Sequence, residues 1–192
     1  CAKGVLLDLA RQQGWEPAGL EISAWAAQYA RDRFGMEVFT GTLDRAPWPD
    51  GSFAAITAFD LIEHLADPAG AIAQARRLLK EGGVLAIETP NAASLLHRGA
   101  ELAFKWSAGR VRWPLVQIYG IGPGGHVAFF DRASLARLLA RHGFRVERVR
   151  YDPMGQALWR PLTRVETLAG WVDRVASGAR GCYHMMVYAR KV

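Results

Sequence analysis

The chain has 192 residues and a mass of 21.1 kDa, and 51% of its residues are hydrophobic while 22% are charged. These values suit a globular domain and exclude a disordered chain. No stretch approaches the roughly 18 uninterrupted apolar residues of a membrane span. The only cysteines are Cys1 and Cys182, which excludes a disulfide framework, so we expect a reducing, cytoplasmic setting.

The net charge of +6 would permit contact with nucleic acid or acidic lipid. The excess comes mostly from scattered arginines, namely Arg76, Arg77, Arg110, Arg112, Arg137, Arg141, Arg145, Arg148 and Arg150. Arginines spread in this way are typical of solvated helix faces. The sequence therefore disfavours nucleic acid as a partner.

A short loop, Cys1 to Gly4, enters a predicted helix over residues 5–13 that ends at Gly14. A glycine-containing loop before a helix presents backbone N–H groups and a positive helix end to a ligand. No strand precedes this helix, although the elements that follow indicate a parallel sheet. We therefore expect that a first strand, upstream of Cys1, is missing from the sequence.

The next part of the chain alternates strands with helices. We expect a strand over residues 18–22, a helix capped by Ser23 and closed by Gly35, a strand and turn over 38–43, and a tight connection over 48–52. Glu21 lies near the end of the first of these strands. A carboxylate there can accept hydrogen bonds from ribose hydroxyls, and it is equally compatible with an ordinary loop carboxylate.

The central unit of the sequence, residues 53–91, reads as strand, loop, crossover helix and strand. Asp67-Pro68 supplies an N-cap and a first helical residue, and apolar residues then recur at helical spacing. We expect Gly82-Gly83 to end this helix, and a buried parallel strand to follow over 84–87 and to end at Pro90. The alternation predicts an α/β fold with a doubly wound, mostly parallel sheet.

Polar side chains gather where the first strand of this unit ends. Phe59 and Asp60 come at the strand end, and Glu63 and His64 follow in the loop. In open α/β sheets ligands bind at the carboxyl ends of the strands. We therefore expect the chemistry at this edge of the sheet.

After Asn91 the pattern loosens. Residues 92–125 mix aromatic and leucine side chains with basic ones and end in a glycine-rich turn. The later expected elements are a helix over 132–142 capped by Asp131, a strand over 144–151, an irregular segment over 152–181 and a strand over 183–189. Without an internal repeat or an interdomain linker, we predict a single domain over residues 1–192.

Several strings, in order, resemble one protein family. They are Cys1-Ala-Lys-Gly4, Leu20-Glu-Ile-Ser23, Gly41-Thr-Leu43, Phe59-Asp-Leu-Ile-Glu-His-Leu65, Leu78-Leu-Lys-Glu-Gly-Gly83, Ile87-Glu-Thr-Pro-Asn91 and the segment from Gly125-His126 to Phe144. Their order and spacing resemble the class I S-adenosylmethionine-dependent methyltransferases, in the subgroup of the ubiquinone-pathway O-methyltransferases. The resemblance covers roughly the first three quarters of the chain.

The resemblance implies S-adenosylmethionine as cofactor, S-adenosylhomocysteine as product and a role for each matching residue. Cys1, Ala2 and Gly4 would surround the methionine part, Glu21 with Ile22 would bind the ribose, Gly41, Thr42 and Leu43 would border adenine, and Phe59 and Asp60 would line the region of the sulfonium. The sequence departs from the family pattern at three positions: Ala2 replaces a usual glycine, Ala54 replaces an aspartate, and Thr42 stands where relatives often carry aspartate.

The resemblance also implies what surrounds the substrate. Residues 92–125 would form a substrate lid, and the segment 152–181 would help to wall the pocket. The aromatic side chains in 92–125 would either bind an acceptor or pack into the core, and the sequence supports both roles equally. The same segment could also make peripheral contact with a membrane. The strand over 183–189 would be an antiparallel edge strand.

Methyl transfer from a sulfonium is an in-line displacement, and it needs a base only if the acceptor must lose a proton. His64 and His126 are the candidate catalytic residues, because each follows a segment expected on the acceptor side. Bracing of a loop explains His64 equally simply. For His126, a buried histidine bonded to the backbone is favoured somewhat over catalysis.

A further string, Asp60-x-x-Glu63-His64, resembles a proposed divalent-metal position in some quinone methyltransferases. Two carboxylates and an imidazole could hold a cation. However, Asp60 should turn towards the cofactor while Glu63 begins the next segment. We therefore predict no metal ligand from the sequence.

Three functions remain open at this stage. The first is an enzyme that methylates a small molecule, on oxygen by analogy with the family. The second is an RNA methyltransferase, which the absence of an Asn-Pro-Pro-Tyr type motif disfavours. The third is a catalytically inactive cofactor-binding domain, for which Ala2 and Ala54 are the only hints. The sequence does not indicate the acceptor or the oligomeric state.

Overall fold

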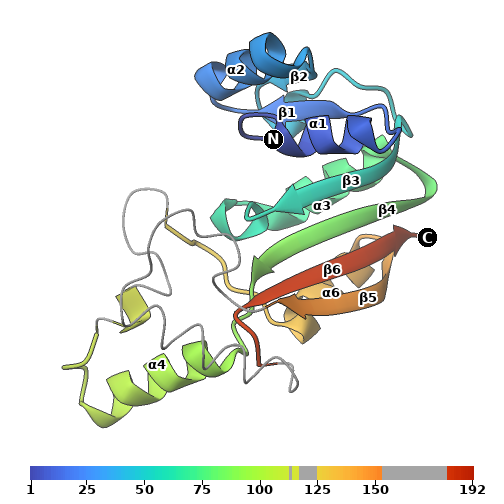
Figure 1. Cartoon of the computed structure of the whole chain (residues 1–192). Coiled ribbons are helices and arrows are strands. Elements are labelled where there is room, and N and C mark those ends of the chain that lie inside the picture. Colours follow the sequence, from blue (N-terminus) through green and yellow to red (C-terminus); the bar gives the residue numbers. More distant parts are fainter. Residues whose placement is uncertain (113, 117–124, 153–180) are drawn as a thin grey trace. The chain divides into compact units, whose positions relative to one another are not determined.

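The computed structural model describes residues 1–112, 114–116, 125–152 and 181–192. It divides into two compact units, Cys1–Ser52 and Phe53–Val192 (Figure 1). The glycine-rich turn at 120–125, except Gly125, and the interior of the segment 152–181 lie outside the described residues.

The first unit alternates helices with two parallel strands. Its elements are α1 (Val5–Gln12), β1 (Ala18–Glu21), α2 (Ala24–Phe34), β2 (Glu37–Thr40) and the 3-10 turn η1 (Leu43–Arg45). The small buried side chains Ala27 and Ala30 of α2 pack with Met36 and Val38. The strand register pairs Glu21 with Thr40, so both strands end at the same edge.

Local signals place the helices of this unit as the sequence predicts. The Ser23 hydroxyl accepts a hydrogen bond from the backbone N–H of Ala26 at 3.3 Å, and Gly35 closes α2 in the left-handed region at φ 62°. Gly4 precedes α1 at φ 82°, and a Cβ there would lie 2.7 Å from the Cβ of Ala30. Only glycine combines that backbone with so close an approach.

The second unit holds a four-stranded sheet in the order β3-β4-β6-β5. The strands are β3 (Phe53–Phe59), β4 (Leu79–Pro90), β5 (Phe144–Asp152) and β6 (His184–Lys191). β3 and β4 run parallel, whereas β6 is antiparallel to both β4 and β5. The expected antiparallel strand is therefore present, but the prediction that it lies at the sheet edge is wrong, because β6 is inserted between two partners.

Helix α3 (Pro68–Leu78) connects β3 to β4. It begins as predicted, with the Asp67 carboxylate accepting from the backbone N–H of Gly70 at 2.8 Å. The prediction that Gly82-Gly83 ends it is wrong. The helix stops at Leu78, because Leu79 is extended, is fully buried and already pairs with Phe53 as the first residue of β4.

Helices α4 and α6 follow β4 in the described part of the chain. Helix α4 (Leu95–Trp106) lies within the segment 92–125 that the sequence analysis treated as irregular, and Ser94 caps it through the backbone N–H of His97. Helix α6 (Arg132–Arg141) begins with a complete capping box between Asp131 and Ser134, as its sequence predicts.

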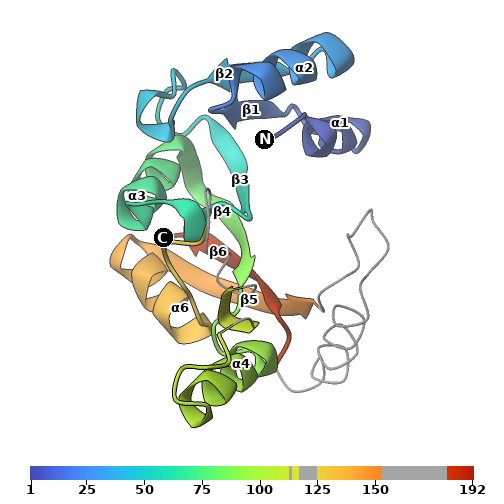
Figure 2. The same ribbon diagram turned by 90° about the vertical axis from the view of Figure 1, so that its left-hand side faces the viewer.

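The core of the second unit lies between the sheet and helices α3 and α6, which cover the same face of it (Figure 2). The largest fully buried apolar side chains are Leu78, Leu79, Leu85, Ile87, Leu135, Leu139, Met185 and Val187. In the described part of the chain, no helix has the length and apolar character needed to cross a membrane.

Candidate functional site

The carboxyl end of β3 places the polar residues expected there. Asp60 follows the strand in the left-handed region at φ 45°, and its backbone N–H donates to the carbonyl of Glu88 on β4 at 3.1 Å. A non-glycine residue in this conformation is uncommon and clusters at functional positions. The chain then turns through η2 (Ile62–His64), where the His64 N–H donates to the Leu61 carbonyl at 3.0 Å.

Glu63 is the buried anchor of this turn, with 2% of its surface exposed. Its Oε2 accepts a hydrogen bond of 2.9 Å from the hydroxyl of Thr89, which is itself fully buried on β4. Its backbone carbonyl accepts from the N–H groups of Val127 and Ala128 at 2.8 and 3.0 Å. Glu63 therefore fastens the segment around His126 to the strand end.

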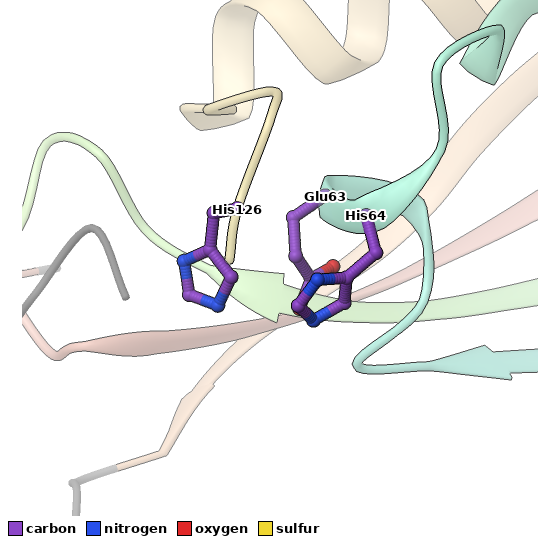
Figure 3. Close-up of side chains that lie close together, drawn as sticks. All are labelled: Glu63, His64 and His126. Carbon is purple, nitrogen blue, oxygen red and sulfur yellow. The ribbon is translucent and has the colours of Figure 1, made fainter. Parts of the chain in front are cut away.

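The two candidate histidines lie side by side (Figure 3). The ring centroids of His64 and His126 are 4.9 Å apart and the rings meet edge to face at 67°. His64 Nδ1 lies 3.3 Å from the carbonyl oxygen of Gly125. His64 and His126 are 62 positions apart in sequence and lie together in the fold. The sequence predicts each of them on the acceptor side, but it does not predict their contact.

Burial governs the charge state of His126. Desolvation, together with the neighbouring His64 and His184, lowers its pKa below the ordinary histidine value, although Glu63 and Asp60 act in the opposite direction. The ring is therefore neutral at pH 7, with a nitrogen lone pair available. A neutral imidazole can accept a proton or bind a cation.

Carboxylates surround the same strand ends. Burial raises the pKa of Glu88, and the nearby Asp60, Asp152 and Glu63 raise it further against the opposing effect of His184. The carboxyl ends of β3 and β4 therefore form an acidic environment.

In the first unit, Glu21 organises the residues predicted to hold the cofactor. Its carboxylate accepts from the backbone N–H of Ala2 at 2.7 Å and from the Ser23 N–H at 3.0 Å. Burial alone would raise the pKa of Glu21, but hydrogen bonds, among them those from the Ser23 and Ala2 N–H groups, lower it. The carboxylate stays ionised and joins the loop before α1 to the end of β1.

The residues predicted to border adenine lie beside Glu21. The Gly41 N–H donates to the Glu21 carbonyl at 3.0 Å, and a Cβ on Gly41 would approach the Phe39 ring to 2.8 Å. The Thr42 side chain forms a hydrogen bond with the Asp44 carboxylate, and this hydrogen bond lowers the pKa of Asp44. The predicted cofactor residues of this unit thus lie at one edge around the Glu21 carboxylate. This arrangement fits a nucleoside whose ribose hydroxyls donate hydrogen bonds to that carboxylate.

Comparison with known proteins identifies the family. A sequence profile described as a methyltransferase domain matches residues 1–149. The chain belongs to the methyltransferase domain family. This methyltransferase domain is 29% identical over 150 residues to a Mycolicibacterium smegmatis protein named "Probable S-adenosylmethionine-dependent methyltransferase", a match that covers 74% of the chain and 58% of the relative. The chain thus spans less than two thirds of that relative's length.

Two other comparisons extend over more of this methyltransferase domain. A ubiquinone biosynthesis O-methyltransferase of Thiobacillus denitrificans is 25% identical over 179 residues, covering 90% of the chain and 72% of the relative. The structure of a SAM-dependent methyltransferase from Archaeoglobus fulgidus superimposes with a TM-score of 0.66 at 17% identity, over 100% of the chain and 83% of that protein. The predicted Rossmann-like methyltransferase fold, with parallel and antiparallel strands, is confirmed.

Sequence reasoning missed one member of the site. Thr89, the partner of the Glu63 carboxylate, lies in the Glu88-Thr-Pro-Asn91 string that helped to reveal the family, but nothing in its local pattern indicates a contact 26 residues away. Several predicted cofactor residues are exposed, namely Cys1, Ala2, Ile22, Thr42, Phe59 and Asp60, with Ile22 73% and Phe59 36% exposed.

Proposed function

We propose that this methyltransferase domain uses S-adenosylmethionine to methylate a hydroxyl oxygen of a small molecule. Family membership supports methyl transfer. The location of the acceptor site is supported by one observation: Glu63, His64 and His126 converge at the carboxyl end of β3. S-adenosylmethionine supplies an electrophilic methyl group on a sulfonium, and S-adenosylhomocysteine leaves after transfer.

The residues assigned to the cofactor are those of the sequence prediction: Cys1, Ala2, Gly4, Glu21, Ile22, Gly41, Thr42, Leu43, Phe59 and Asp60. Glu21 accepts the ribose hydroxyls, because it is an ionised carboxylate at the end of β1. Gly41 allows close approach next to it, since any side chain there would meet Phe39. The hydrogen bond from Asp60 to Glu88 fixes the turn after β3.

His64 and His126 are assigned to the acceptor hydroxyl. A site that positions a hydroxyl oxygen and promotes loss of its proton contributes typically ~10²–10⁴-fold to rate. Transfer to oxygen, rather than nitrogen or carbon, is supported by the relative named as a ubiquinone biosynthesis O-methyltransferase. Residues 92–125 are proposed as the substrate lid and 152–181 as a second wall, and the cysteine usage supports a cytoplasmic reaction.

Calorimetry with S-adenosylmethionine, followed by transfer of a labelled methyl group to a panel of phenols and catechols, tests this function. We expect saturable cofactor binding and label on oxygen. With the accepted substrate, His64→Ala and His126→Ala should each slow turnover by at least about tenfold. His142→Ala, at the end of α6, is the matched control and should retain the wild-type rate. Absence of cofactor binding would refute the proposal, and wild-type turnover in both histidine variants would remove these residues from it.

A further inference from the structure

A cavity of about 270 Å³ lies beside the end of β4, where helices α4 and α6 begin. Four of the side chains that line it are charged or phenolic, namely Arg98, Asp131, Arg132 and Tyr151. Pockets that enclose a drug-sized ligand measure roughly 300–1,000 Å³. This cavity therefore has room for one substituted end of a small molecule.

Hydrogen bonds within the chain fix the walls of this cavity. The N–H of Ala92, before α4, donates to the carbonyl of Phe130, before α6, at 2.9 Å, so the starts of the two helices are joined. The side chain of buried Asn91, which also lines the cavity, donates to the Cys182 carbonyl at 3.0 Å. The cavity is thus formed by the fold itself, and little reorganisation is needed for a ligand to enter it.

The cavity carries a net positive charge. Among the described residues, no carboxylate forms an ion pair with the guanidinium group of Arg98 or of Arg132. The Asp131 carboxylate accepts from the Ser134 N–H at 2.7 Å, and hydrogen bonds from Ser134 hold its pKa below the ordinary value. Two guanidinium groups therefore stand against one carboxylate that already caps α6. Guanidinium groups bind carboxylate and phosphate oxygens with paired N–H donors.

The cavity lies within a short distance of the proposed acceptor site. Thr89, Met185 and Tyr151 are register partners on the neighbouring strands β4, β6 and β5. Because neighbouring strands are ~4.8 Å apart, Tyr151 at the cavity lies about 10 Å from Thr89, whose hydroxyl donates to Glu63. Asn91 is only two residues beyond Thr89. A substituted aromatic ring has a comparable length, so one small molecule can reach both places.

We propose that Arg98 and Arg132 bind an anionic group, a carboxylate or a phosphate, on the small molecule that this domain methylates. The identity of the ligand as the methyl acceptor rests on the proposed function, whereas binding of the anion does not. Arg98 and Arg132 determine which acceptor binds and do not contact the reacting atoms. The negative group offsets the positive charge of the cavity while the acceptor hydroxyl lies at the histidines.

NMR titration of the full chain with benzoate and with phenyl phosphate, without S-adenosylmethionine, tests the binding. We expect one molecule per chain, with an affinity that falls about fivefold or more in Arg98→Gln and in Arg132→Gln, because each variant loses charge-assisted hydrogen bonds. Tighter binding of benzoate would identify a carboxylate, and tighter binding of phenyl phosphate would identify a phosphate. Both arginines are exposed, so these variants should fold.

The matched controls are Lys105→Gln on α4 and Arg141→Gln on α6. Each removes one exposed positive charge from the same helix, at a residue that does not line the cavity, and each should bind the anion as the wild type does. No anion binding by the wild type, or equal binding by the wild type and the double variant Arg98→Gln with Arg132→Gln, would overturn the inference.

Methyl transfer to plain catechol and to catechols that carry a carboxylate or a phosphate tests the link to the acceptor. The better anion should give a lower KM than plain catechol, and the double variant should lose this advantage in KM while kcat stays within about twofold. Equal KM values for all three in the wild type would refute the link. If S-adenosylmethionine does not bind but anion binding still depends on the two arginines, the proposed function fails and the anion site stands.

Discussion

At the scale of single residues, Glu21 carries the most specific prediction for the cofactor. Replacing it by Gln removes the charge that accepts from Ala2 and Ser23 and would accept from ribose hydroxyls. Hydrogen bonds to charged groups contribute about 1.5–3 kcal/mol, so we expect Glu21→Gln to weaken S-adenosylmethionine binding by roughly 10- to 100-fold in calorimetry.

The matched control is Glu37→Gln. Glu37 lies at the opposite, amino end of the same pair of strands, where it accepts from the indole N–H of Trp48 at 3.0 Å. Its replacement should leave cofactor affinity within about twofold of wild type. Equal affinity in Glu21→Gln and wild type would show that this carboxylate does not bind the cofactor.

His97 gives a pH prediction of defined sign. Burial beside Phe129 and Tyr183 is the main cause that lowers its pKa from 6.5 to about 4, with His126 contributing in the same direction and Glu101 opposing. Because the unfolded chain protonates first, stability is complete above pH 6.5 and is lost as pH falls towards 4. At pH 4.5 the loss through this group is about 2–3 kcal/mol.

Chemical denaturation at pH 7 and pH 4.5 measures this effect. His97→Gln has no titrating group at the position, so its free energy of unfolding should fall by about 2–3 kcal/mol less than that of the wild type over this interval. Comparing the fall, rather than the stability itself, cancels any direct effect of the substitution. The same pH dependence in both proteins would contradict the assignment.

At the scale of elements, the N-cap of α6 is the clearest test of a sequence signal. The Asp131 carboxylate accepts from the Ser134 N–H at 2.7 Å, and the Ser134 hydroxyl accepts from the Asp131 N–H at 2.9 Å. Because α6 contributes the fully buried Leu135 and Leu139 to the core, fraying of its first turn should lower the free energy of unfolding. Asp131→Ala should lower the free energy of unfolding by ~1 kcal/mol, within a range of 0.5–2.

Asp131→Asn is the control for this prediction. Asparagine caps helices about as well as aspartate, so this variant should retain most of the stability that the alanine variant loses. Urea denaturation of the two variants at pH 7 makes the comparison. Equal losses would mean that charge, and not the capping hydrogen bond, stabilises the start of α6.

Elements fixed by local chemistry are those that the sequence predicts best. Ser23, Asp67 and Asp131 cap the helices expected of them, because a cap depends on residues within three positions. The end of α3 was misjudged because the pairing of Leu79 with Phe53, 26 residues away, overrides the two later glycines. Helix α4 was missed although Ser94 is an ordinary cap, because the resemblance favoured an irregular lid.

At the scale of the whole molecule, strand order and the candidate site depend on contacts that no local pattern encodes. The place of β6 between β4 and β5 follows from pairings such as Ile87 with Val187. In the same way, the sequence names His64 and His126 as candidates, but only the fold shows that Glu63 brings their segments together. The sequence therefore predicts which residues are candidates for the site, but the structure is needed to show which of them lie together.

The whole-molecule charge of +6 leads to a prediction about RNA. Several arginines are already paired with carboxylates: Arg190 with Glu147 at 2.6 Å, Arg11 with Asp8 at 2.6 Å and Arg150 with Asp152 at 3.3 Å. Such pairing reduces the positive field that a phosphate backbone would meet. We therefore expect only weak, sequence-independent binding of a tRNA transcript, with Kd in the range of ~10⁻⁴–10⁻⁶ M at physiological salt.

Fluorescence anisotropy at 50 and 200 mM salt measures this binding, and transfer of a labelled methyl group in the same samples measures modification. Binding held only by phosphate contacts weakens steeply with salt, so the anisotropy change should largely disappear at the higher concentration. We expect no label in RNA under conditions in which a small phenol is methylated. Salt-resistant binding below ~10⁻⁷ M, or label in the transcript, would instead support an RNA methyltransferase, because specific recognition adds contacts that salt does not screen.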